Sequence, residues 1–451
     1  MRRSAESGHV SCEGAGSSVR SHASGSSLIA VMAIVAAVLL IGTAIFLLGH
    51  SEGDVVEYTV DDSRAFYLAE GGLERMRAWL GDFFGDAPLG DPVGKVFSDQ
   101  ALGGGKYTVE VTDETSTGGW VRAYTVDSVG DKDGALRQVR AIMVEETFAA
   151  YQVFVERGGW VWFRTGERFE GPVHVNHTLQ IDGDPWFGGP VTAGGGLTMK
   201  DGSNPTFEQG YTLNVDTIDL PPDNYGETDI RPEAESGGQV FPGLDGQDAK
   251  YIFELGRFGE GTLGYQSYEL VDHSYVLSPW DTLDLSTING AIYSEEPVRI
   301  SGVLDGQLTI AADGDIEISD DLTYAGAPPG GGPGPDCDDV LGLIANGDII
   351  IARTPPNDDN CVVHAVMMAL EKNIEAEDYM HGDPRGVFEI WGGLIADYSI
   401  HLGQYKGDAL ISGYSRDYHW DWRLISMPPP FFPTTGRFLV YSWEEVVPVE
   451  A

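Results

Sequence analysis

Three acidic pairs are candidates for catalysis or for binding a cation. A glycosidase needs two carboxylates that face each other across a cleft, whereas carboxylates in loops could bind Ca²⁺. The chain has no EF-hand loop and no glycine-rich calcium repeat, and acidic turns more often face solvent. We therefore expect no cofactor and keep calcium as an alternative. The pairs are Asp182/Asp184, Asp313/Asp315 and Asp320/Asp321.

Two histidines, His174 and His177, have a spacing that can hold a metal when both lie on a helix. Pro172 and the neighbouring glycines argue against a helix, and on a strand the two rings would point to opposite faces. The sequence therefore predicts no metal at this pair. It also lacks a nucleophile elbow, a phosphate-binding glycine loop and a zincin motif, so we expect no catalytic residues and no enzymatic activity.

An aromatic cluster near the C-terminus allows two interpretations. Its rings could stack on sugars, or they could cover the open end of a β domain, whose terminal strands must be protected. We favour the second interpretation and keep a surface or carbohydrate ligand as an alternative. The cluster comprises Tyr414, Tyr418, Trp420 and Trp422.

All of these residues follow an N-terminal segment that begins with an uncharged apolar run from Leu28 to Leu48. At about 1.5 Å per residue, this run spans roughly 31 Å, the thickness of the hydrocarbon core of a bilayer. Arginines before the run favour a cytoplasmic N-terminus and an exported C-terminal part. A plain, uncleaved signal anchor remains an alternative.

The apolar run continues into an amphipathic segment without a turn signal. Residues 54–84 contain no proline, and apolar residues recur at steps of three and four, which is typical of one helix face. The sequence therefore predicts a single helix over residues 26–84. The apolar positions are Phe66, Ala69, Leu73, Met76, Leu80 and Phe83.

Two motifs give this N-terminal region a family resemblance. Gly25-Ser26-Ser27-Leu28-Ile29 resembles a prepilin peptidase site, and the segment from Phe66 to Glu74 resembles the F-x-x-AE-x-x-L signature of PilX-like minor type IV pilins. The resemblance implies that residues 1–25 are a cytoplasmic leader, that Gly25 is its last residue and that Ser26 begins the mature chain.

The same resemblance implies roles along the helix. Phe66, Glu70 and Leu73 would belong to the face that serves filament assembly, although Glu70 also fits an ordinary solvated helix glutamate. The fifth mature residue, a glutamate in major pilins, is Ala30 here, which favours a minor or tip subunit.

The chain has three cysteines. If the leader is removed, Cys12 leaves with it. Cys337 and Cys361 then form an even pair in an exported domain, which predicts a disulfide worth ~3 kcal/mol, with two free thiols as the alternative.

The remainder of the chain predicts an α+β protein. Residues 85–147 read as a small antiparallel sheet of three or four strands, and residues 148–451 as a large all-β domain. Short strands at even intervals, separated by Asp-Gly and Asn-Gly turns, favour a parallel β-solenoid, and a β-sandwich remains an alternative.

The large domain also resembles a family of uncharacterised function that often follows PilX-like N-termini. No activity is established for that family, so the resemblance implies none. The similar stretches are Gly171 to Asn176, Gly290 to Tyr293, Leu341 to Ala345, Gly413-Tyr414, Asp421 to Arg423 and Pro429 to Pro433.

The net charge of −43 excludes one class of partner. Nucleic-acid binding through the phosphate backbone needs a basic surface, so we expect none. The expected partners are other pilin subunits, the prepilin peptidase and, before assembly, the inner membrane. The chain would span that membrane once, with its large domain outside the cytoplasm, and later join a cell-surface pilus or pseudopilus.

We therefore expect a non-enzymatic minor pilin-like subunit that displays a large β domain for assembly priming or adhesion. Two alternatives remain: a membrane-anchored carbohydrate-active β-solenoid enzyme, and a structural envelope protein that is never cleaved.

Overall fold

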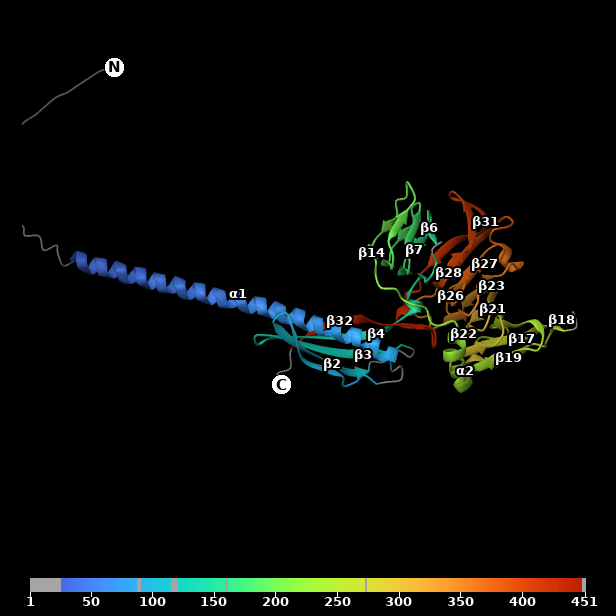
Figure 1. Ribbon diagram of the computed structural model, residues 1–451, viewed down its shortest axis with the longest axis horizontal. Coiled ribbons are helices and arrows are strands. Elements are labelled where there is room, and N and C mark those ends of the chain that lie inside the picture. Colours follow the sequence, from blue (N-terminus) through green and yellow to red (C-terminus); the bar gives the residue numbers. More distant parts are fainter. Residues whose placement is uncertain (1–25, 87–90, 115–120, 159–160, 272–273, 448–451) are drawn as a thin grey trace, which may run out of the picture.

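A long N-terminal helix, a small sheet and a large β domain follow one another in the computed structural model (Figure 1). The structure describes residues 26–86, 91–114, 121–158, 161–271 and 274–447. Gly25 and the rest of the predicted leader lie outside these residues.

The predicted single helix is confirmed. Helix α1 runs without a break from Ser26 to Asp86, so it is about 90 Å long at 1.5 Å per residue. Its segment Leu28–Leu47 has a mean hydropathy of 2.9 and none of it is buried. By length and composition this segment can cross a membrane. Beyond Asp61 the helix packs on the small sheet.

The small sheet has five antiparallel strands in the order β1-β2-β3-β4-β32. We call this sheet, with residues 61–86 of α1, the head. The sequence predicts three or four strands within residues 85–147, whereas the fifth strand, β32, comes from the end of the chain that the prediction assigns to the large domain. The strands are β1 (Val96–Leu102), β2 (Gly105–Glu114), β3 (Ala123–Lys132), β4 (Ala135–Thr147) and β32 (Thr434–Val446).

Two glycines let α1 lie directly on the sheet. A Cβ atom at Gly130 on β3 would come within 1.9 Å of the carbonyl oxygen of Ala65, and one at Gly72 would come within 2.2 Å of Ser128 Oγ. Real Cβ atoms do not approach other atoms so closely, so both positions exclude larger residues. The core beneath the helix includes Leu68, Leu73, Met76, Leu80, Val109, Val126, Met143 and Phe438.

The large domain is mostly β. Its first part comprises β5 (Val153–Val155), β6 (Trp162–Arg164), β7 (Arg168–Phe169), β8 (Val173–Val175), β9 (Leu179–Asp182), β10 (Trp186–Phe187), β11 (Val191–Ala193), β12 (Leu197–Met199), β13 (Thr206–Phe207) and β14 (Tyr211–Leu213). After helix α2 (Arg231–Gly237), the second part comprises β15 (Gln239–Phe241), β16 (Gln247–Leu255), β17 (Thr262–Val271), β18 (Ser274–Leu277), β19 (Asp281–Asp284), β20 (Ala291–Ser294), β21 (Val298–Leu304), β22 (Gln307–Ala312) and β23 (Ile316–Tyr324). The third part comprises β24 (Val340–Ala345), β25 (Ile349–Ile351), β26 (Cys361–Ala369), β27 (Asn373–Ala376), β28 (Pro384–Ala396), β29 (Ser399–His401), β30 (Gly403–Lys406) and β31 (Ala409–His419).

Most neighbouring strands of this domain pair in parallel, unlike the antiparallel hairpins typical of a sandwich. The longest run is β15-β20-β22-β24-β26-β28-β5-β8-β11-β14, in which every pair is parallel. Sequence order is broken once inside this run, where Leu394 of β28 pairs with Val153 of β5. The first strand of the domain therefore pairs with a strand from its C-terminal part, in the middle of this run.

The predicted disulfide is not formed. Cys337 and Cys361 are both buried free thiols that pack in the apolar core of the large domain. The Cys337 thiol lies 3.5 Å from the carboxylate of Asp339. Burial raises the pKa of the Cys361 thiol, so this side chain behaves as a small apolar group.

Candidate assembly surface

The three predicted assembly residues on the second half of α1 come together beside β32. The Phe66 ring meets the Trp443 ring edge-on, with 5.8 Å between ring centroids. Leu73 is buried in the core of the head. Glu70 borders a hollow of about 390 Å³ that is also lined by Leu73, Glu74, Val440 and Trp443. Helix and C-terminal strand thus form one surface.

Glu70 differs from its neighbour Glu74 in its contacts. The Glu74 carboxylate forms an ion pair with Arg77, with 2.6 Å between Oε2 and Nη2. Among the residues that the structure describes, no side chain forms a hydrogen bond or ion pair with the Glu70 carboxylate. Its oxygens can accept hydrogen bonds from a group that enters the hollow.

Strand β32 exposes apolar side chains at an edge of the head sheet. It pairs with β4, and the sheet order places it at the end. Its exposed residues Leu439, Val440, Tyr441 and Trp443 are 41–59% accessible. Edge strands of this kind pair readily with another chain unless they are covered. Sequence reasoning missed β32, although the β-branched and aromatic residues of 438–443 were the available signal.

Ser26 and Ala30, the described residues of the predicted N-terminal site, lie at the other end of α1, far from this surface. Ser26 is the first residue of α1, and Ala30 is exposed within the apolar segment. Gly25 lies outside the described residues.

The acidic pairs are used in local contacts of the large domain. Asp182 forms ion pairs with Lys200 and Arg164, at 2.7 and 3.3 Å. The other carboxylates accept hydrogen bonds: Asp184 from the Asn204 N–H at 2.8 Å, Asp313 from the Tyr293 hydroxyl at 2.6 Å, Asp315 from the Asp348 N–H at 2.8 Å, Asp320 from the Asp321 N–H at 2.8 Å and Asp321 from the Val362 N–H at 2.8 Å. Within the described ranges, no group of three or more His, Cys, Asp or Glu side chains is arranged to hold a metal ion.

The two histidines do not come together. His174 is buried on β8, where its Nδ1 lies 2.7 Å from Thr192 Oγ1 and its Nε2 lies 2.8 Å from Asn176 Oδ1. Burial lowers the pKa of His174, so its ring is neutral at pH 7. His177, which follows the strand, is exposed.

The aromatic cluster does not form one platform. Tyr414 is buried and donates its hydroxyl to the Asn357 carbonyl. Trp420 is half-buried and donates Nε1–H to the Ala150 carbonyl at 3.2 Å, whereas Trp422 is exposed. Tyr418 alone of the four lines a cavity.

Comparison with known proteins assigns no activity to these surfaces. A domain of unknown function (DUF4900) matches residues 106–196, which run from the head sheet into the first strands of the large domain. No curated protein matches the chain. The crystal structure of the competence-associated pilin ComZ from Thermus thermophilus is similar over 86% of this chain and 98% of its own, with 13% identity and a TM-score of 0.34. Neither the identity nor the score is high enough to establish a shared fold or function.

Proposed function

We propose that this protein is a minor pilin-like subunit of a type IV pilus or a related pseudopilus. One observation carries the proposal: helix α1 is unbroken, its apolar segment Leu28–Leu47 is wholly exposed, and its part beyond Asp61 packs on the head sheet. An exposed apolar helix needs a bilayer or other apolar helices around it. A subunit that moves from a membrane into a filament core meets both in turn.

The large domain would be the displayed part of this subunit. We interpret its parallel strand register as a β-solenoid that is carried at the tip or side of the filament. In this proposal the domain is non-enzymatic and serves assembly priming or adhesion.

The surface formed by α1 and β32 would contact a neighbouring pilin subunit. The Glu70 carboxylate accepts a donor from that neighbour, and Val440 and Trp443 become covered.

The test is the N-terminal sequence and mass of the full chain recovered from membranes, with and without the prepilin peptidase. We expect a chain that starts at Ser26 only when the peptidase is present. The variant Gly25→Leu should block this cleavage, whereas Gly16→Leu, a matched change within the leader region, should not. A chain that keeps residues 1–25 in the presence of active peptidase would refute the pilin pathway and favour an uncleaved anchor.

A further inference from the structure

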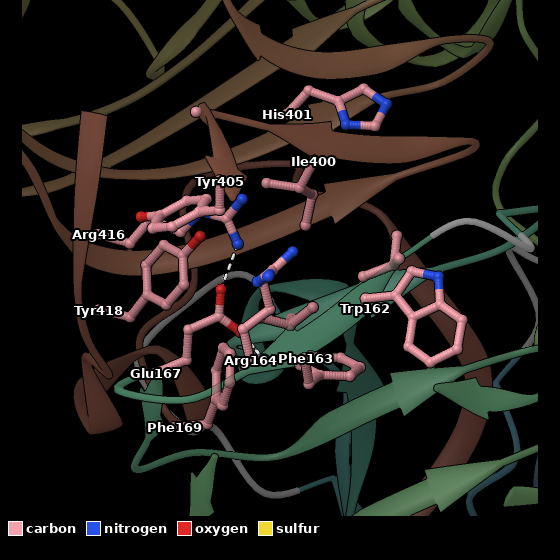
Figure 2. A pocket seen from close by; sticks show the side chains of 13 residues that line it. Trp162, Phe163, Arg164, Glu167, Phe169, Ile400, His401, Tyr405, Arg416 and Tyr418 are labelled. Atoms are coloured by element: carbon pink, nitrogen blue, oxygen red, sulfur yellow. Dashed lines mark hydrogen bonds and ion pairs between the residues drawn. The ribbon is translucent and has the colours of Figure 1, made fainter. Parts of the chain in front are cut away.

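A small cavity lies between the first strands of the large domain and strands from its C-terminal part (Figure 2). Its volume is about 160 Å³, and its walls come from residues 161–169 on one side and residues 400–418 on the other. The pairing of β28 with β5 brings these distant segments together.

The polar groups of the cavity are arranged around one glutamate. Glu167, which is 8% exposed, forms an ion pair with Arg416 across the cavity (Figure 2). Its second carboxylate oxygen accepts the backbone N–H of Arg164 at 2.8 Å. Both oxygens of Glu167 are therefore in contact, and this residue holds the Arg416 guanidinium and the backbone at Arg164 in place.

The two guanidinium groups keep unused donors. Among the described residues, the Arg416 side chain donates only to Glu167, although a guanidinium has five N–H groups. Arg164 donates to the Gly407 carbonyl at 2.9 Å and lies 3.3 Å from Asp182. Asp182 is in turn paired with Lys200, so the charge of this group of side chains is positive overall. In a chain of net charge −43, a cationic cavity selects for a negatively charged ligand.

His401 adds no charge to the cavity. Burial lowers the pKa of His401, and the nearby positive charge of Arg416 lowers it further. The ring is therefore neutral at pH 7, and its Nε2 lies 2.7 Å from the hydroxyl of Ser399.

Aromatic rings form the remaining walls. The centroid of the Tyr405 ring lies 5.2 Å from the Arg164 guanidinium and 5.5 Å from the Arg416 guanidinium. Tyr418 stacks on Phe169, and its hydroxyl points toward the ion pair of Glu167 and Arg416 (Figure 2). Ligand sites typically combine aromatic walls with a few converging polar groups, as here.

We propose that this cavity binds a carboxylate-bearing monosaccharide unit, such as a uronate. The carboxylate of the sugar accepts hydrogen bonds from Arg164 and Arg416, its ring lies against the aromatic walls, and the Tyr418 hydroxyl binds a ring hydroxyl. The cavity is smaller than the usual 300–1,000 Å³ of ligand sites, so it accepts one sugar unit, free or at the end of a glycan. The inference rests on the proposed display of the large domain only for its biological setting.

The experiment is a calorimetric titration of the full chain, in nonionic detergent, with galacturonate, galactose and acetate. We expect galacturonate to bind at least about tenfold more tightly than galactose, which lacks the carboxylate, or acetate, which lacks the ring. A glycan that ends in galacturonate should bind as well as the free sugar if the site takes terminal units, and should not bind if it takes the free sugar alone.

Matched variants locate the site. Arg164→Gln should weaken galacturonate binding about tenfold, whereas Arg168→Gln, which removes the same charge from an exposed side chain stacked on Trp186, should not. Trp162→Leu serves as a second cavity variant, and thermal unfolding of each variant checks that the fold is kept.

Three results would overturn the inference: no binding of galacturonate by the intact chain, equal binding of acetate, or equal losses for Arg164→Gln and Arg168→Gln. Failure of cleavage before Ser26 would refute the proposed function and leave this titration unaffected, so the two failures are distinguishable.

Discussion

The head and the large domain both join chain segments that are far apart in sequence, but they do so with different interactions. In the head, β32 and α1 are held by an apolar core and by the close approach at Gly72 and Gly130. In the large domain, a buried ion pair between two residues close in sequence, Arg423 and Asp421, is tied to a remote segment by hydrogen bonds. Arg423 and Asp421 are 4% and 1% exposed, and Arg423 also donates to the carbonyls of Cys337 and Asp339.

The most nearly comparable ion pair of the head is less buried. Arg122 lies 3.3 Å from Glu145, but its side chain is 34% exposed. The head is therefore held mainly by close packing, whereas the large domain also depends on buried charged groups where remote segments join. Substitutions that disturb packing should therefore destabilise the head, and substitutions that remove a buried charge should destabilise the large domain.

The largest effect is expected from Arg423→Met. It leaves the buried Asp421 carboxylate without its partner, which typically costs about 3–5 kcal/mol. Hydrogen exchange should show faster exchange in the large domain and little change in the head. The control is Arg353→Met, whose side chain is 42% exposed and whose ion pairs are 3.5 and 3.8 Å long. Equal losses for both variants would contradict the assigned role of buried charge.

The second effect is expected in the head. Gly130→Ala places a Cβ atom against the Ala65 carbonyl, and such overpacking costs about 3 kcal/mol. Hydrogen exchange should increase in residues 61–86 of α1 and in β3, while the large domain stays protected. Gly196→Ala is the matched control, because a Cβ atom there meets nothing within 4 Å. Loss of protection in both regions would show that they unfold as one unit.

The third effect is a pH dependence confined to the large domain. Burial, with a contribution from Arg423, lowers the pKa of His364 to about 4. Since the unfolded chain binds a proton near its ordinary pKa of about 6.5, the free energy of unfolding should fall as pH drops from 7 to 5, by about 2 kcal/mol for this group.

The variant His364→Gln should remove that share of the pH dependence, as measured by denaturant unfolding at each pH. His177→Gln, at an exposed position, should leave it unchanged. An identical slope in the protein and in His364→Gln would refute the assignment.

The sequence was sufficient where the signal was local. The apolar run and the spacing of Phe66, Leu73 and Leu80 predicted helix α1 because neighbouring turns of one helix carry the pattern. That Phe66, Glu70 and Leu73 serve filament assembly stays a prediction.

The sequence was insufficient where structure depends on segments that meet only after folding. The Thr434 hydroxyl of β32 donates a hydrogen bond to Glu145 of β4, 289 residues away in sequence. Arg416 likewise donates to Glu167, 249 residues away. No local period marks such pairs, so Val440, Trp443 and most of the cavity went unpredicted. The predicted disulfide was wrong for the same reason: an even number of cysteines says nothing about the distance between them.

The position of β32 has a consequence for biogenesis. Since β32 follows the whole large domain in sequence, the head sheet cannot be completed until the large domain has been synthesised. A chain that stops before Thr434 leaves β4 with an open edge and removes Val440 and Trp443 from the surface beside Glu70. Completion of the head is therefore coupled to synthesis of the large domain: only a chain made as far as β32 presents both the helix side and the strand side of the surface beside Glu70.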